Sequence, residues 1–72
     1  MTFGTEQQLA DFLGSIQPHY RDYAAPLWAS VVRSADELAN GSVDTLVEAG
    51  ITNRLHAENI KAKAGVHAGQ WL

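Results

Sequence analysis

Residues 32–51 read VRSADELANGSVDTLVEAGI and contain the signatures of two consecutive helices. Ser34 precedes Glu37 by three positions, which is the spacing of a reciprocal capping box at a helix start. An Asn-Gly pair then stops this helix, and Ser42 is placed to cap the next one. Gly50, followed by an apolar residue, suits the left-handed position that closes a helix. The stretch therefore predicts two short helices joined by a tight turn.

Upstream of this stretch, apolar residues recur at helical spacing. Four of them share one face of a helix expected over about 5–16. They are Leu9, Phe12, Leu13 and Ile16. Pro18 breaks this helix, because proline lacks a backbone donor and disfavours the α region at the preceding residue. A second helix is expected over about 20–31, with Asp22 as its N-cap and Pro26 in its first turn, where backbone N–H groups have no intrahelical partner.

Downstream, a fifth and longer helix is expected to begin near Thr52 or Asn53. It ends at Gly65 or Gly69 and leaves residues 70–72 as a tail, whose tryptophan either packs back on the domain or belongs to a longer protein. The expected division of the chain is an N-terminal lead-in, a domain and a tail, at 1–6, 7–68 and 69–72.

The predicted fold is all-α, a compact five-helix bundle with a long C-terminal helix. Its expected core residues are Leu9, Phe12, Leu13, Ile16, Tyr23, Leu27, Val32, Leu38, Leu46, Ile51 and Ile60.

The composition limits the kind of protein this can be. With 72 residues, 46% of them hydrophobic, the chain has room for one small domain. Without cysteine it forms neither a disulfide framework nor a thiolate zinc site. No nucleophile-elbow, phosphate-loop or metalloprotease spacing occurs, so we expect no catalytic residues, no metal and no cofactor. With no apolar run near the ~20 residues of a membrane span and no signal peptide, we expect an intracellular, cytoplasmic module.

The formal net charge of −3 is unevenly distributed along the chain. Residues 1–50 carry seven acidic and two basic side chains, a net −5, whereas residues 51–72 carry one acidic and three basic side chains, a net +2. An acidic front half and a basic end indicate either internal pairing or a bipolar surface. They argue against a strongly basic nucleic-acid binder.

In their order and spacing, these features resemble the sterile alpha motif (SAM) family over residues 7–64. The stretch 32–51 resembles the family's succession of an apolar residue, a Leu, a hydroxyl N-cap, a second Leu and a Gly-Ile pair, and His56 and Ile60 continue it at the family's spacing. Residues 23–27, YAAPL, are similar to the family's Tyr-Ala-x-x-aromatic segment. The first helix also carries an aromatic-Leu pair like that of the family.

Three places depart from the family pattern. Residues 17–19, QPH, resemble a small insertion where the family usually turns at a glycine. Residues 55–57, LHA, replace the commoner Gly-His-Arg, and Gly41 stands where a core Leu is frequent. The chain therefore resembles a divergent member of the family.

The resemblance implies a non-catalytic protein–protein interaction module whose partner is another SAM-like domain or a second copy of this chain. SAM domains commonly associate head to tail, with a mid-loop surface docking on an end-helix surface around the start of helix five. The expected mid-loop residues, named here the acidic surface, are Asp36, Glu37, Asp44 and Glu48. The expected end-helix residues, named here the basic surface, are Asn53, Arg54, Leu55, His56 and Lys61. Leu55 is the expected apolar centre of the contact.

The residues also allow other interpretations. The charged side chains can form a solvated face without a partner, since exposed ion pairs contribute little to affinity. Arg54, Lys61 and Lys63 can instead bind RNA or DNA, although the net charge of −3 disfavours this alternative. His56 can be a first-turn residue that packs its ring or hydrogen-bonds locally, rather than a metal ligand.

Overall fold

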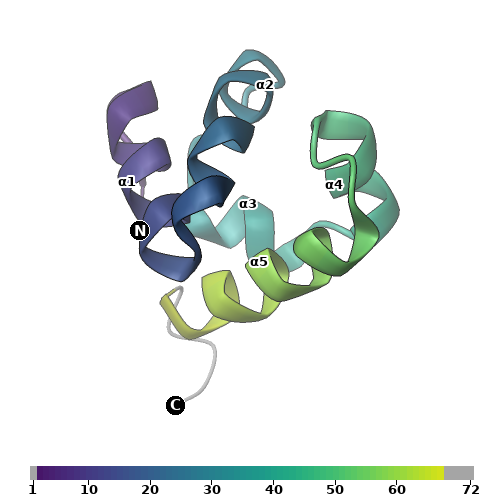
Figure 1. The fold of residues 1–72 in the computed structure, drawn as a ribbon. Helices are drawn as coiled ribbons and strands as arrows, with labels where there is room; N and C mark the ends of the chain where they lie inside the picture. The colour runs from purple at the N-terminus through teal and green to yellow at the C-terminus, as the bar shows by residue number, and fades with distance from the viewer. Residues whose placement is uncertain (1, 68–72) are drawn as a thin grey trace.

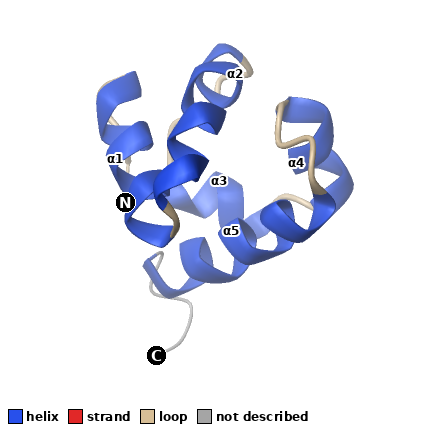
Figure 2. Cartoon of the chain, viewed as in Figure 1, coloured by secondary structure: helices blue, strands red, loops and turns tan. Residues whose placement is uncertain are grey.

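The structure is a computed structural model in which residues 2–67 are described (Figure 1). Over this range the elements are α1 Glu6–Ile16, the 3-10 helix η1 Pro18–Tyr23, α2 Ala24–Ala29, α3 Ala35–Asn40, α4 Val43–Ala49 and α5 Arg54–His67. The described part of the chain holds no strand, only an isolated bridge between Thr2 and Ser34 (Figure 2). The predicted all-α bundle is confirmed. The expected tail at 69–72, including Trp71, lies outside the described residues.

Helix α1 lies where the sequence predicts it. The Thr5 hydroxyl accepts a hydrogen bond from the N–H of Gln8 (3.1 Å) and caps the helix. Three of its four predicted core residues are buried, while Ile16 is half-buried. The helix ends before Gln17, whose backbone is extended (φ −147°, ψ 133°). The break predicted ahead of Pro18 is therefore confirmed.

The segment after this break differs from the prediction. Pro18 is the first residue of η1, because a proline at that position gives up an N–H that has no helical partner anyway. Asp22 lies inside η1 and is not an N-cap, so that prediction is wrong. Helix α2 instead follows Tyr23, which makes no side-chain cap bond. Pro26 does lie in the first turn of α2, as predicted.

Helix α2 ends at Ala29, two residues before the predicted end, because the chain turns at Val31. Val31 has a φ of 64°. Its N–H donates to the carbonyl of Trp28 (3.1 Å), and the N–H of Val32 donates to the carbonyl of Leu27 (3.0 Å). This pair of bonds is the Schellman motif, in which glycine usually occupies the left-handed position. A β-branched residue there is a conformational outlier.

Helix α4 closes with the same motif at Gly50, as the sequence predicts. The N–H of Ile51 donates to the carbonyl of Leu46 (3.1 Å), and the N–H of Gly50 to that of Val47 (3.2 Å). Gly50 has a φ of 135°, and a Cβ added to it would lie 2.4 Å from the Cβ of Pro26. Glycine is thus required both by the backbone conformation and by the close approach of α2.

The two predicted serine caps are confirmed. The Ser34 hydroxyl accepts from the N–H of Glu37 (3.2 Å), and the Ser42 hydroxyl accepts from the N–H of Thr45 (3.1 Å). The return bond of the capping box is displaced by one residue, because the Glu37 carboxylate accepts from the N–H of Arg33 (3.2 Å). Helices α3 and α4 therefore start where local sequence places them.

Helix α5 runs along the base of the bundle, against α3 and α4, with its far end near α1 (Figure 1). Gly65 does not end this helix, which continues to His67; the predicted end at Gly65 is therefore wrong. Ala64 and Gly65 are both buried, so packing against the body of the domain outweighs the low helix propensity of glycine. The alternative end at Gly69 lies outside the described residues.

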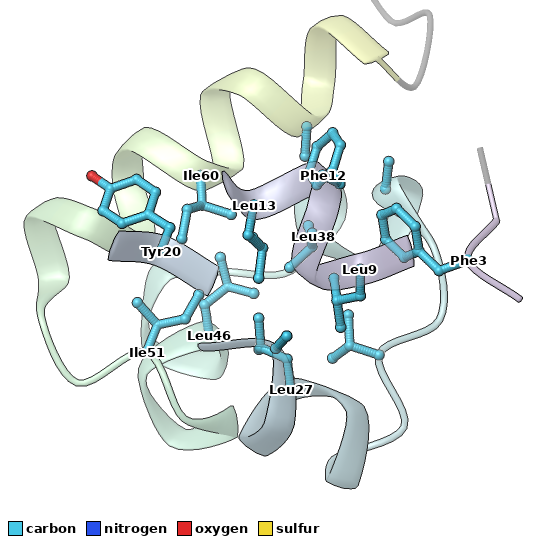
Figure 3. Close-up of a cluster of buried hydrophobic side chains, with 14 of the residues drawn as sticks. Phe3, Leu9, Phe12, Leu13, Tyr20, Leu27, Leu38, Leu46, Ile51 and Ile60 are labelled. Atoms are coloured by element: carbon cyan, nitrogen blue, oxygen red, sulfur yellow. The ribbon is translucent and has the colours of Figure 1, made fainter. Parts of the chain in front are cut away.

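The core gathers side chains from every helix (Figure 3). Nine of the eleven predicted core residues are buried, whereas Ile16 and Tyr23 are half-buried. The further buried hydrophobic residues, absent from the expected core, are Phe3, Tyr20, Ala24, Ala35, Ala39, Ala57 and Ala64. Four of these are alanines on α3 and α5, where small side chains leave room for the two helices to approach closely.

The expected lead-in at 1–6 contributes to this core through Phe3. The Phe3 side chain is 3% exposed, and its ring centroid lies 5.3 Å from that of Phe12 on α1 (Figure 3). Its N–H donates to the carbonyl of Arg33 (2.6 Å). The N-terminal segment is thereby joined both to the first helix and to the loop before α3.

Candidate interaction surface

The start of α5 is fixed by the side chain of Asn53. Its carboxamide oxygen accepts hydrogen bonds from the N–H groups of Leu55 (2.9 Å) and His56 (3.3 Å). These bonds satisfy two of the donors that a helix N-terminus leaves free. Asn53, expected on the basic surface, therefore acts as the N-cap of α5. Leu55 projects from this turn and is 73% exposed.

Arg54, the neighbouring residue, forms an ion pair within the same chain. Its Nη1 donates to Oδ1 of Asp44 at 2.5 Å, and the two side chains are 63% and 75% exposed. The hydrogen bond to Asp44 and the charge of that carboxylate raise the pKa of the Arg54 guanidinium. The structure therefore brings together one residue of the predicted basic surface and one of the predicted acidic surface.

His56 is turned into the domain. It is half-buried, and its Nδ1 lies 2.6 Å from the hydroxyl of Tyr23. Its ring also packs against those of His19 and Tyr20, at centroid distances of 5.3 and 4.8 Å. The expected packing of the His56 ring is confirmed, whereas its side-chain partner, Tyr23, is 33 residues distant and not local. The ring joins η1 to α5.

Lys61 caps the C-terminus of α3. Its ammonium group donates to the carbonyl oxygens of Ala39 (2.5 Å) and Gly41 (2.9 Å). The last carbonyls of a helix lack intrahelical donors and carry partial negative charge, so a cation is favourable there. Lys61 was expected on the basic surface, but its ammonium group binds carbonyl oxygens of its own chain.

The remaining acidic residues lie on exposed positions of α3 and α4. Asp36 and Glu37 belong to the first turn of α3, and Glu48 to the end of α4. Glu37 accepts the Arg33 N–H described above, and none of the three forms an ion pair with a described cation. These three carboxylates of the predicted acidic surface therefore carry charges that no described cation neutralises.

Most cations of residues 2–67 are engaged within the chain. Arg21 pairs with Asp11 (3.0 Å), and the Arg33 guanidinium lies 3.5 Å from the ring centroid of Trp28. Among the lysines and arginines that the structure describes, Lys63 alone is exposed without such a contact. Of the three basic residues considered for nucleic-acid binding, two therefore already have partners inside the fold.

Residues 2–67 were also searched for metal sites and for membrane-spanning helices. Within residues 2–67, no group of three or more His, Cys, Asp or Glu side chains is placed to hold a metal ion. Over the same residues, no helix has both the length and the apolar character needed to cross a membrane.

Sequence reasoning missed two exposed features. Val31 is 65% exposed in its left-handed conformation, and the Asp44–Arg54 pair links the two predicted surfaces. The only sequence signal for the pair is opposite charge ten residues apart across the Gly-Ile turn. Comparison of the chain with protein-family models, curated proteins and solved structures gives no match.

Proposed function

We propose that the chain is a non-catalytic protein-interaction module that associates head to tail with a second copy of itself or with another SAM-like domain. In this contact, the start of α5 on one copy docks on the acidic residues of α3 and α4 of the next. The observation that carries the proposal is Leu55, an apolar side chain that is 73% exposed on a turn fixed by the Asn53 cap.

The surroundings of Leu55 support a docking role. Arg54 precedes it and keeps most of its side chain in solvent, so an apolar centre is bordered by a cation. Interfaces commonly combine an apolar centre with a polar rim. A preorganised helix start also reduces the ordering cost of binding.

The complementary half of the contact is acidic. Asp36, Glu37 and Glu48 are exposed and lack an ion-pair partner among the described cations. Opposite charge on the two surfaces increases the association rate and selects the partner more than it adds affinity. The resemblance of residues 7–64 to SAM domains favours the same arrangement.

The geometry of such a contact is heterologous, because the two surfaces are different patches of one molecule. A heterologous contact leaves one free surface at each end of a pair and therefore extends into a chain unless a ring closes. We expect the average mass of the wild type to exceed that of a dimer as concentration rises.

Sedimentation equilibrium with surface-blocked variants tests this proposal. Leu55→Asp blocks one surface, and Asp36→Lys combined with Glu48→Lys blocks the other. Each variant alone is expected to stay monomeric, because an open chain needs both surfaces on every copy. An equimolar mixture of the two variants is expected to form a one-to-one dimer and nothing larger.

The matched control is Val66→Asp, which places the same charge at another exposed apolar position of α5. It is expected to associate like the wild type. A wild type that stays monomeric at millimolar concentration, a mixture that forms no dimer, or equal losses in the Leu55 and Val66 variants would contradict the proposal.

A further inference from the structure

The Asp44–Arg54 pair lies across the corner between α4 and α5. This corner is fixed at one end by the Gly50 closure of α4 and at the other by the Asn53 cap of α5. The two side chains therefore meet across a defined turn of backbone. Their contact is one hydrogen bond, from Nη1 of Arg54 to Oδ1 of Asp44, and both side chains remain largely exposed.

This contact bears directly on the proposed docking surface. Arg54 directly precedes Leu55 and is largely exposed, so its charge is available to a carboxylate of a partner that docks on Leu55. Asp44 already neutralises that charge and occupies one of the guanidinium donors. A second carboxylate must either displace Asp44 or share the guanidinium with it, and two carboxylates at one cation repel each other.

We propose that Asp44 is an intramolecular competitor that masks Arg54 from the acidic surface of a second copy of this chain. The inference rests on the proposed head-to-tail function. It assigns Asp44 to regulation of the basic surface, in contrast to its expected place on the acidic surface. The residues that bind Arg54 in the partner copy are then the uncompensated carboxylates of α3 and α4, Asp36, Glu37 and Glu48.

The occupant is a second copy because the same chain provides the complementary charge. Within residues 2–67, Asp36 and Glu48 are exposed and have no basic partner, whereas Arg54 is the exposed cation beside the apolar centre. Docking then exchanges an internal ion pair for an intermolecular one. The masking contact thereby sets the concentration at which copies associate.

The exchange predicts an unusual dependence on salt. In the wild type one exposed ion pair is lost and one is formed, so screening by salt affects both sides of the equilibrium similarly. In Asp44→Asn an ion pair is formed without one being lost. Association of this variant is therefore expected to weaken more steeply with salt than association of the wild type.

The test measures association constants by sedimentation for the wild type, Asp44→Asn and Asp36→Asn. Asp44→Asn is expected to tighten association about two- to fivefold, the range of an exposed ion pair. Asp36→Asn is expected to weaken it. Both substitutions keep the shape of the side chain, and thermal melts verify that each variant is folded.

Asp11→Asn is the matched control. It removes the same charge and breaks the exposed pair with Arg21, which also joins residues ten apart. It is expected to leave association unchanged. If Asp11→Asn tightens association as much as Asp44→Asn does, net charge explains the effect and masking is wrong.

The two proposals fail in different ways. If Asp44→Asn weakens association as Asp36→Asn does, Asp44 belongs to the acidic surface; masking is then overturned while the head-to-tail function stands. If the wild type and Asp44→Asn both stay monomeric, or if Leu55→Asp has no effect on association, the proposed function fails and the masking inference fails with it.

Discussion

Val31 and Gly50 occupy equivalent positions at the ends of α2 and α4, where the backbone must take a positive φ. Gly50 accepts this conformation without steric cost, and nothing larger fits against Pro26. Val31 takes a φ of 64° with a β-branched side chain that is 65% exposed. The left-handed conformation costs a residue with a Cβ roughly 1–2 kcal/mol, so α2 ends in a strained residue.

Replacing Val31 with glycine should therefore stabilise the domain. Glycine removes the steric cost but increases the entropy of the unfolded chain, so the expected net gain in unfolding free energy is about 0.5–1 kcal/mol. Urea denaturation of the wild type and of Val31→Gly measures this gain in unfolding free energy. Val66→Gly, at an exposed valine in ordinary helical conformation, is the control and should bring no gain. A loss of stability in Val31→Gly would contradict the prediction, since the strain of the valine would then be smaller than the entropy that glycine adds to the unfolded chain.

At the scale of the elements, Lys61 connects α3 to α5. Lys61→Met keeps much of the apolar stem but removes the ammonium group that binds the carbonyls at the end of α3. We expect it to lower the unfolding free energy by about 1.5–3 kcal/mol, the range for hydrogen bonds that involve a charged group.

Lys63 offers a matched control, because it lies two residues further along the same helix and is exposed without a described partner. Lys63→Met is expected to change stability by less than about 0.5 kcal/mol. Chemical denaturation of both variants gives the comparison. Equal effects would mean that the loss comes from helix propensity or net charge and not from the cap.

The elements that the sequence predicts correctly depend on residues close together in the chain. The Ser34 and Ser42 caps each reach three residues ahead, and the Gly50 closure spans one turn. Some contacts that it does not predict are distant, such as that of Lys61, which reaches back 22 residues to Ala39. The turn at Val31 is local but was also missed, because no glycine marks it.

The same distinction applies to the candidate site. Leu55 could be proposed from the sequence because it stands where the family that the chain resembles commonly has Gly, and comparing single positions needs no knowledge of distant contacts. The role of His56 depends on Tyr23, 33 residues earlier, which no local pattern indicates. The net charges of −5 for residues 1–50 and +2 for residues 51–72 were compatible with internal pairing and with a bipolar surface. The Asp44–Arg54 ion pair shows internal pairing for one residue of each predicted surface.

At the scale of the whole molecule, the small core makes each large side chain important. A domain of 72 residues is expected to have an unfolding free energy of about 4–11 kcal/mol. Phe3, outside any helix, is 3% exposed and packs on Phe12. Phe3→Ala should lower the unfolding free energy by about 3–4 kcal/mol, a large fraction of the total.

Thermal and urea denaturation of Phe3→Ala measure this loss, and Thr2→Ala, at an exposed neighbour, is the control. If Phe3→Ala melts like the wild type, the N-terminal segment does not contribute to the core in solution. A large loss would mean that fragments starting at residue 7 lack part of the stability of the domain.

The shortness of the middle helices has a consequence for how the protein is made. Helices α2, α3 and α4 have six, six and seven residues, well below the roughly 12–15 that an isolated helix needs to be stable in water. Helix α3 rests on α5, which supplies Ala57, Ile60 and Ala64 to the core and Lys61 to the end of α3. A nascent chain therefore cannot complete this fold until about residue 64 has left the ribosome, so folding has to follow synthesis of nearly the whole domain.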